Sequence, residues 1–107
     1  MVRAERREFR DLLLEAVDEA LLILGESARK AIYWHLERQY SLKRGEIADR
    51  LSDFVSALNS IFGRGSAVIQ GLIIRRLYSK LGLEPPEEGD FLSLIRRARE
   101  VFESQST

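Results

Sequence analysis

The sequence predicts an all-α protein, a compact five-helix bundle-like single domain over residues 1–107 with a hydrophobic helix at its centre. Apolar residues recur at spacings of three and four in successive segments, which is the period of an amphipathic helix. Nowhere does an apolar and polar alternation persist together with β-branched residues, as a strand would require. The 107 residues are 45% hydrophobic and 32% charged, which is typical of one folded domain with its own core.

The composition excludes several kinds of chemistry. The chain contains no Cys, which removes disulfides, thiolate metal sites and thiol catalysis. Its N-terminus lacks the cationic-then-apolar order of a signal peptide, and we find no run of about 18 uncharged apolar residues that could span a membrane. We therefore expect a soluble, cytoplasmic protein that does not interact with membranes.

The first expected element is a long amphipathic helix from about Val2 to Leu24, ended by Gly25. It carries two apolar seams, offset by about 100° around the helix axis. One seam consists of Phe9, Leu13, Ala16, Ala20 and Ile23, and the other of Leu14, Val17, Leu21 and Leu24. One seam faces the core of its own domain, whereas the second needs a further partner. That partner is either another helix of the same chain or the same helix of a second subunit.

The second expected helix covers Glu26–Tyr40, with Ser27 as its N-cap. Its inner stripe consists of Ala28, Ile32, Leu36 and Tyr40. Trp34 lies on the opposite side of the helix. An outward Trp either folds over a neighbouring element or anchors an interface, because Trp is enriched at binding hot spots. Both interpretations stay open.

Two helical patterns follow, an amphipathic one from Ile47 to Phe62 and the central one over Ser66–Leu81. The stretch Val68–Ile74 is apolar nearly all round its axis, which is typical of a helix buried on several sides. Ala67 and Gly71, four residues apart, leave a small-residue notch on the central helix.

The junction between these two helices contains Gly63 and Gly65, which permit positive φ in a tight reversal, and Ser66, which is placed to cap the next helix. Glycines before a helix also suggest a phosphate-binding loop. However, no Gly-Lys-Ser/Thr follows, and a helix rather than a strand precedes the glycines. A tight helix–helix turn is the better interpretation.

The last part begins with a glycine-terminated turn at Leu81-Gly82-Leu83. Residues 84–90 form an acidic, Pro-rich connector that cannot continue a helix, because proline removes a backbone donor and fixes φ. Asp90 is expected to cap a final helix over residues 90–104. Residues 11–83 form the core of the single domain in this interpretation.

The sequence offers no constellation that predicts catalysis or a bound metal. His35 is the only imidazole, and its place at the edge of the inner stripe indicates a partly buried, hydrogen-bonded packing residue. His35 and Glu37 point to different faces of the helix and cannot share a metal ion. Carboxylates of the first helix are mixed with arginines, which is typical of a solvated face. We therefore predict no enzyme and no cofactor.

The basic residues of the central helix give an alternative function. The candidate phosphate contacts are Arg64, Arg75, Arg76 and Lys80. A few such cations give salt-dependent nucleic-acid binding. Against this, cations near a helix C-terminus are favoured by its dipole, and the acidic connector could neutralise them. The formal net charge of zero also differs from the basic balance typical of nucleic-acid binders.

Several segments resemble a known family, most distinctively the Phe62-Gly63-x-Gly65 junction after an amphipathic helix. They are Leu24-Gly25, Ala31–Tyr33, Leu36–Leu42, Phe54 with Leu58, Ile61–Ala67, Ile74, Leu77-Tyr78 and Leu81–Leu83. Over roughly residues 12–83 this order resembles the small archaeal helical domains called Nitrosopumilus output domains, fifth type. The resemblance implies an all-helical signalling module with no assigned reaction and brings no catalytic residue.

The sequence therefore predicts a non-enzymatic module that binds a protein, most simply a second copy of itself. The candidate interface residues are Leu14, Val17, Leu21, Leu24 and Trp34. A nucleic-acid-binding regulator and a ligand pocket between helices are the alternatives, since small-molecule sites can be largely apolar.

Overall fold

The computed structural model describes residues 8–105 and contains α-helices and short 3₁₀-helices there, with no strand in that part of the chain. The α-helices are α1 (Phe9–Leu22), α2 (Glu26–Tyr40), α3 (Leu51–Phe62), α4 (Ser66–Lys80) and α5 (Phe91–Gln105). The 3₁₀-helices are η2 (Arg44–Asp49) and η3 (Gly63–Gly65). The predicted all-α fold with five helices is confirmed.

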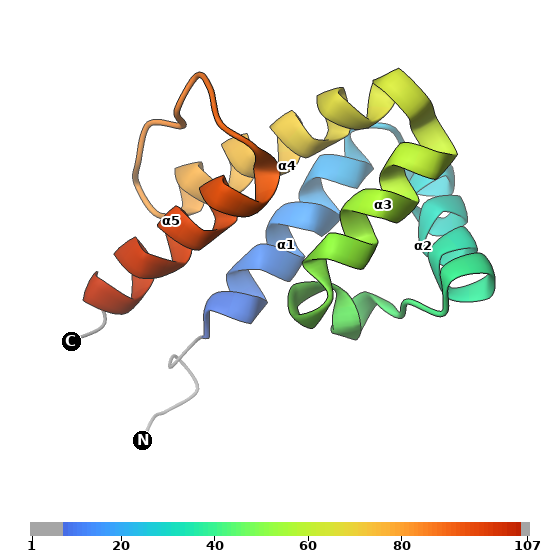
Figure 1. Ribbon diagram of the computed structural model, residues 1–107, viewed down its shortest axis with the longest axis horizontal. Helices are drawn as coiled ribbons and strands as arrows, with labels where there is room; N and C mark the ends of the chain where they lie inside the picture. Colours follow the sequence, from blue (N-terminus) through green and yellow to red (C-terminus); the bar gives the residue numbers. More distant parts are fainter. Residues whose placement is uncertain (1–7, 106–107) are drawn as a thin grey trace.

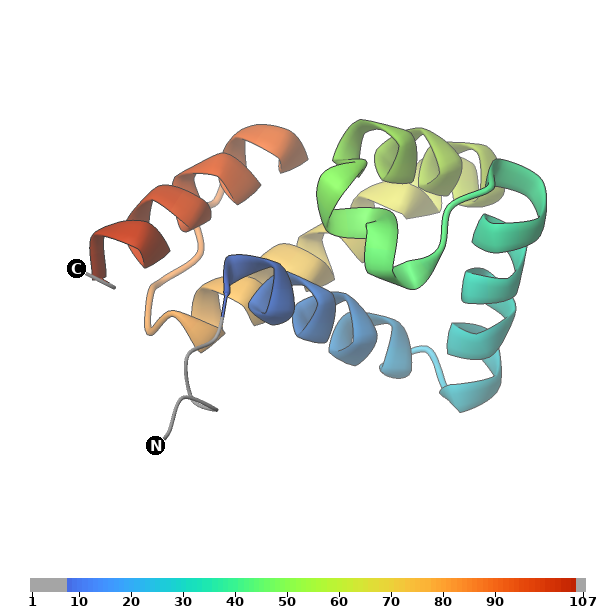
Figure 2. The same cartoon turned by 90° about the horizontal axis from the view of Figure 1, so that it is seen from below.

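The centre of the molecule is the crossing of α1 and α4 (Figures 1 and 2). Helix α4 packs against α1, α3 and α5, which confirms its predicted central place, while α1 also contacts α2 and η2. Helices α5 and α2 lie at opposite ends of the long axis in both views. The expected enclosure of Val68–Ile74 holds only in part, because Ile69 and Ile73 are buried and Val68 is 65% exposed.

Helix α1 buries both of its apolar seams inside its own chain, except for their last residues, Ile23 and Leu24, which are exposed. The buried residues are Phe9, Leu13, Leu14, Ala16, Val17, Ala20 and Leu21. The prediction that Leu14, Val17 and Leu21 form an interface between subunits is therefore wrong, because the helices packed around α1 already cover them. The predicted residues Val2–Arg7 of this helix lie outside the described part.

The α1–α2 connection differs from the expected one. The helix ends at Leu22, followed by a turn through Ile23 and Leu24. Gly25 has φ 110° and occupies the N-cap position of α2, so it begins the second helix rather than ending the first. Ser27 is consequently inside the helix, and its predicted role as N-cap is wrong.

The predicted helix from Ile47 is divided in two. Residues 44–49 form η2, whose first turn is held by the Glu46 carboxylate, which accepts a hydrogen bond from the Lys43 backbone N–H at 3.0 Å. The backbone of Arg50 leaves the helical region with φ −131° and ψ 50°, and α3 starts at the next residue. Because the turn buries Ile47 and Ala48, the 3₁₀ segment contributes to the core as a separate element.

The chain reverses at the glycine junction, and only Gly63 adopts a backbone conformation there that favours glycine. Gly63 has φ 56°, whereas Gly65 has φ −66° and needs no glycine for its conformation. The Ser66 side chain does not cap α4, because Ser66 is the first residue of the helix and its Oγ accepts a hydrogen bond from Gln70 Nε2 at 2.8 Å.

The stretch Leu51–Lys80 has the length and composition of a membrane-spanning helix, a signal that core helices of soluble proteins also give. The reversal at Gly63 divides it into segments of 12 and 15 residues. Each is shorter than the roughly 20 apolar residues that cross a bilayer. This stretch therefore carries no argument for a membrane span.

The C-terminal part follows the predicted order. Gly82 has φ 73°, and the Leu83 N–H donates to the Tyr78 carbonyl at 2.9 Å, which closes α4 with a Schellman-type turn. Asp90 caps α5 as predicted, accepting from the Ser93 N–H at 3.4 Å and from the Ser93 hydroxyl at 2.6 Å. The Tyr78 hydroxyl donates to the Leu94 carbonyl at 2.8 Å and fixes α5 on α4.

Candidate functional site

Three consecutive large aliphatic residues are exposed at the end of α1. Leu22, Ile23 and Leu24 are 46%, 60% and 43% exposed. We call these three residues the apolar corner. Single exposed aliphatic residues are common on protein surfaces, whereas contiguous ones mark interaction sites. Of the predicted interface residues in α1 and the turn after it, only Leu24 belongs to this surface.

The exposure of Leu22 and Ile23 was not predicted from the sequence. Ile23 belongs to the seam assigned to the core, and Leu22 belongs to neither seam. The helical pattern gives no sign that the covering helices stop short of the end of α1. The signal available was the run of four aliphatic residues, Leu21–Leu24, before a glycine, because an amphipathic surface helix rarely carries apolar residues on every side.

An ion-pair seam joins α1 to α4 beside the corner. Lys80 Nζ lies 2.7 Å from Glu19 Oε2 and 3.4 Å from Glu15 Oε1. Arg76 Nη2 lies 2.9 Å from Glu19 Oε1. The hydrogen bond from Lys80 lowers the pKa of the Glu19 carboxyl more than burial raises it, and the hydrogen bond from Arg76 lowers it further.

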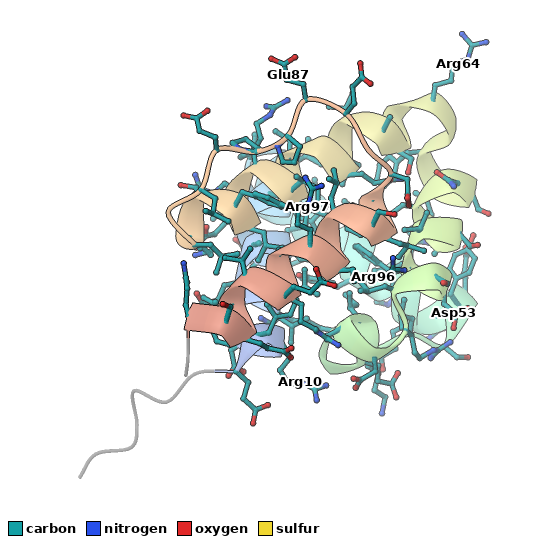
Figure 3. The ribbon with its side chains drawn as sticks, turned by 60° about the vertical axis from the view of Figure 1, so that its left-hand side comes forward. Arg10, Asp53, Arg64, Glu87, Arg96 and Arg97 are labelled. Carbon is teal, nitrogen blue, oxygen red and sulfur yellow. The ribbon has the colours of Figure 1, made fainter. Side chains whose placement is uncertain are left out.

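These pairs change the interpretation of the predicted basic face. The sequence left the acidic connector as one possible source of neutralising charge, but the carboxylate partners of Arg76 and Lys80 come from α1. Arg64 and Arg75 have no ion pair with any residue of 8–105, and Figure 3 shows Arg64 projecting away from the molecule. The four predicted phosphate contacts therefore do not form one continuous cationic surface.

A second polar cluster fixes the other side of α1. Asp18 accepts hydrogen bonds from the Tyr33 hydroxyl of α2 and from Arg44 Nε of η2, the latter at 3.0 Å. Burial alone would raise the pKa of the Asp18 carboxyl, but the hydrogen bonds from Arg44 and Tyr33 outweigh it and lower the pKa. Burial and the bond to Asp18 raise the pKa of Tyr33. The cluster joins three elements and acts as a structural clamp.

Trp34 is exposed on the outer face of α2, with 55% of its surface accessible. The Arg38 guanidinium lies 5.1 Å from the centre of its ring, in cation–π geometry. His35 stacks edge-on against it at 5.3 Å between ring centres. The prediction of a partly buried His35 is confirmed, but the expected hydrogen bond is absent at Nδ1, which is buried and has no partner among the described residues.

A cavity of about 520 Å³ lies between the first half of α4, the connector and the start of α5. Its apolar wall is formed by Ala67, Gly71, Ile74, Pro86, Phe91 and Leu94. The small-residue notch predicted at Ala67 and Gly71 thus opens onto this cavity. Sequence reasoning located the notch but not the connector that lies over it.

Within residues 8–105, no three or more His, Asp and Glu side chains are grouped closely enough to hold a metal ion. Comparisons of the chain with protein-family models, with curated proteins and with solved structures give no match. The resemblance to Nitrosopumilus output domains therefore stays a prediction, and the functional argument rests on the surfaces of the molecule.

Proposed function

We propose that this chain is a non-enzymatic, helical protein-interaction module that associates with a second copy of itself through the apolar corner. The observation that supports the proposal is the exposure of Leu22, Ile23 and Leu24 next to a helix whose other apolar residues are buried or, at Leu12, partly buried. Covering aliphatic surface stabilises an association by about 25 cal/mol per Å² before the costs of binding are subtracted.

The charges around the corner favour a second copy over a strongly charged partner. Glu19 of the Glu19–Arg76 pair lies one helical turn before the corner along the chain, and the Glu26–Arg29 pair, 2.9 Å apart, begins two residues after it. Both pairs therefore present a carboxylate and a guanidinium. In a two-fold dimer the same patch meets itself, so a rim with both signs can be complementary to its own copy. The net charge of zero adds no long-range repulsion between copies.

The corner alone is small beside a standard interface, which buries about 800 Å² on each partner. We therefore expect a weak, concentration-dependent dimer in which Ile23 lies near the centre and Trp34 contributes at the edge. A weak dimer suits a cytoplasmic signalling output, the role that the family resemblance implies, because a change in local concentration then controls association.

Sedimentation velocity over a wide range of protein concentration tests the proposal. The wild-type chain should shift from monomer to dimer as concentration rises. Ile23→Glu together with Leu24→Glu should raise the dissociation constant by about a hundredfold or more, because buried carboxylates without partners are costly. Circular dichroism should remain unchanged, since both side chains are exposed in the monomer.

Val68→Glu is the matched control, because Val68 is equally apolar and 65% exposed but lies on α4 outside the corner. It should leave the dissociation constant unchanged. Trp34→Ala should weaken association by a smaller factor than the corner variant. A chain that stays monomeric at every concentration contradicts self-association, and equal losses for Val68→Glu and the corner variant contradict the assignment to the corner.

A further inference from the structure

The cavity beside α4 has the size of a small-molecule site. Its volume of about 520 Å³ lies within the range of roughly 300–1,000 Å³ that is usual for ligand pockets. Its walls come from α4, from α5 and from the proline-containing connector that joins them, so consecutive segments of the chain fold back on one another to form the pocket.

Gly71 lies in the middle of α4, where packing does not require a glycine. A Cβ at this position would meet only Arg75 Nη2, at 3.9 Å, which is an ordinary contact distance. Glycine inside a helix is less favourable than alanine, because it loses more backbone freedom on folding. The glycine instead leaves the wall of the cavity open beneath the guanidinium of Arg75.

Arg75 is the only cation among the described side chains that line the cavity. The charged side chains among them are Arg75, Glu87 and Asp90. Both carboxylate oxygens of Asp90 accept hydrogen bonds from Ser93. Glu87 directs its carboxylate outward from the connector (Figure 3). Arg75 has no ion pair with a described residue, and its Nη2 lies close to Gly71.

The remaining surface is suited to an apolar body. Ile74, Phe91 and Leu94 present aliphatic and aromatic groups to the cavity, and Pro85 and Pro86 form the facing wall. A guanidinium beside such a surface recognises a carboxylate through paired N–H donors, while the apolar wall takes the rest of the molecule. We propose that this cavity binds a small monocarboxylate with a compact apolar or aromatic body.

The test is a titration of the full chain with benzoate and phenylacetate, followed by amide chemical shifts and calorimetry. Benzamide and benzylamine have similar bodies but are neutral and cationic. The carboxylates should change the amide chemical shifts of residues 67–75 and 85–94. Benzamide and benzylamine should bind at least about tenfold more weakly. Equal binding of benzamide would overturn the role of Arg75, and absence of any shift would overturn the site.

Two variants locate the site, and one serves as the matched control. Arg75→Gln should lower carboxylate affinity by about tenfold or more, whereas Arg64→Gln removes the same charge from an arginine outside the cavity and should have no effect. Gly71→Leu should abolish binding by filling the cavity. An equal loss for Arg64→Gln, or unchanged binding in Gly71→Leu, contradicts the assignment. The variant Ile23→Glu with Leu24→Glu should bind the carboxylates as tightly as the wild type does. The test of the cavity is therefore independent of the test of the dimer.

Discussion

The middle of α1 and its end carry similar side chains in opposite surroundings. Leu21 is fully buried, and Ile23, two residues later, is 60% exposed. The middle is covered by α4, α2, η2 and α5, whereas the apolar side chains continue beyond these elements. The seam for which the sequence predicts an outside partner is mostly buried inside the chain. The apolar surface that remains exposed is instead the apolar corner at the end of the helix.

The two regions also differ in polar contacts. Asp18 and Glu19 join the middle of α1 to α2, η2 and α4 through hydrogen bonds and ion pairs. The corner consists of three aliphatic side chains, which can form no such contacts. The middle is therefore expected to determine stability, and the end to determine association.

The largest expected effect on the free energy of unfolding comes from truncating the buried Leu21. Leu21→Ala should lower the free energy of unfolding by about 2–5 kcal/mol, because it removes a fully buried side chain and leaves a cavity. Ile23→Ala should change it by less than about 1 kcal/mol, since most of the side chain is in water. Urea unfolding followed by circular dichroism measures both. Equal losses would mean that Ile23 is covered in solution and would contradict its exposure in the monomer.

A smaller effect is expected from the Asp18 clamp. Asp18→Asn should lower the free energy of unfolding by about 1–3 kcal/mol, because it weakens charge-assisted bonds to Arg44 and Tyr33. The folded pKa of Asp18 is lowered, so its contribution is complete above the unfolded carboxyl pKa of about 3.9. That contribution is lost as the pH falls through the folded pKa.

Unfolding measured from pH 7 to acid tests this sign. The free energy of unfolding of the wild type should approach that of Asp18→Asn as the pH falls below about 4. Asp49→Asn is a suitable control, because Asp49 pairs with Arg10 at 2.7 Å but is 66% exposed. A constant difference between wild type and Asp18→Asn over the whole range would contradict the clamp.

The smallest effect is expected from the ion-pair seam. Glu19→Gln should cost less than about 1 kcal/mol, because Glu19 and Arg76 are 35% and 50% exposed and solvent screens the pair. Added salt should reduce the difference further. Thermal unfolding at low and high salt measures it. A larger, salt-independent loss would show that the seam contributes to the stability of α1 as strongly as the buried residues do.

Local features of the fold were predictable because they depend on neighbouring residues. The bounds of α2 were predicted as Glu26–Tyr40, and the Asp90 cap and the Gly82 turn were also anticipated. The break at Arg50 was not, because the residues from Ile47 onward keep a helical period across it. At this break the 3₁₀ turn buries Ile47, and Arg50 Nη1 donates a hydrogen bond of 2.7 Å to the Ser41 carbonyl; both contacts join segments that a local pattern does not relate.

The candidate sites were less predictable than the fold. The outward position of Trp34 followed from its helix face, but the sequence left open whether a neighbouring element covers it. The Ala67–Gly71 notch followed from its spacing. The cavity needed the connector to lie over α4, and the pairing of Arg76 and Lys80 needed α1 beside them. Neither proximity is encoded in a local pattern.

The sequence by itself determined that this chain is helical, where most of its helices begin and end, and which face of each is apolar. These properties follow from a period of 3.6 residues and from capping within a few positions. Only the tertiary structure decided which apolar face meets which, because that depends on helix lengths and crossing geometry between distant segments. It covered Leu14, Val17 and Leu21 and left Leu22, Ile23 and Leu24 in water.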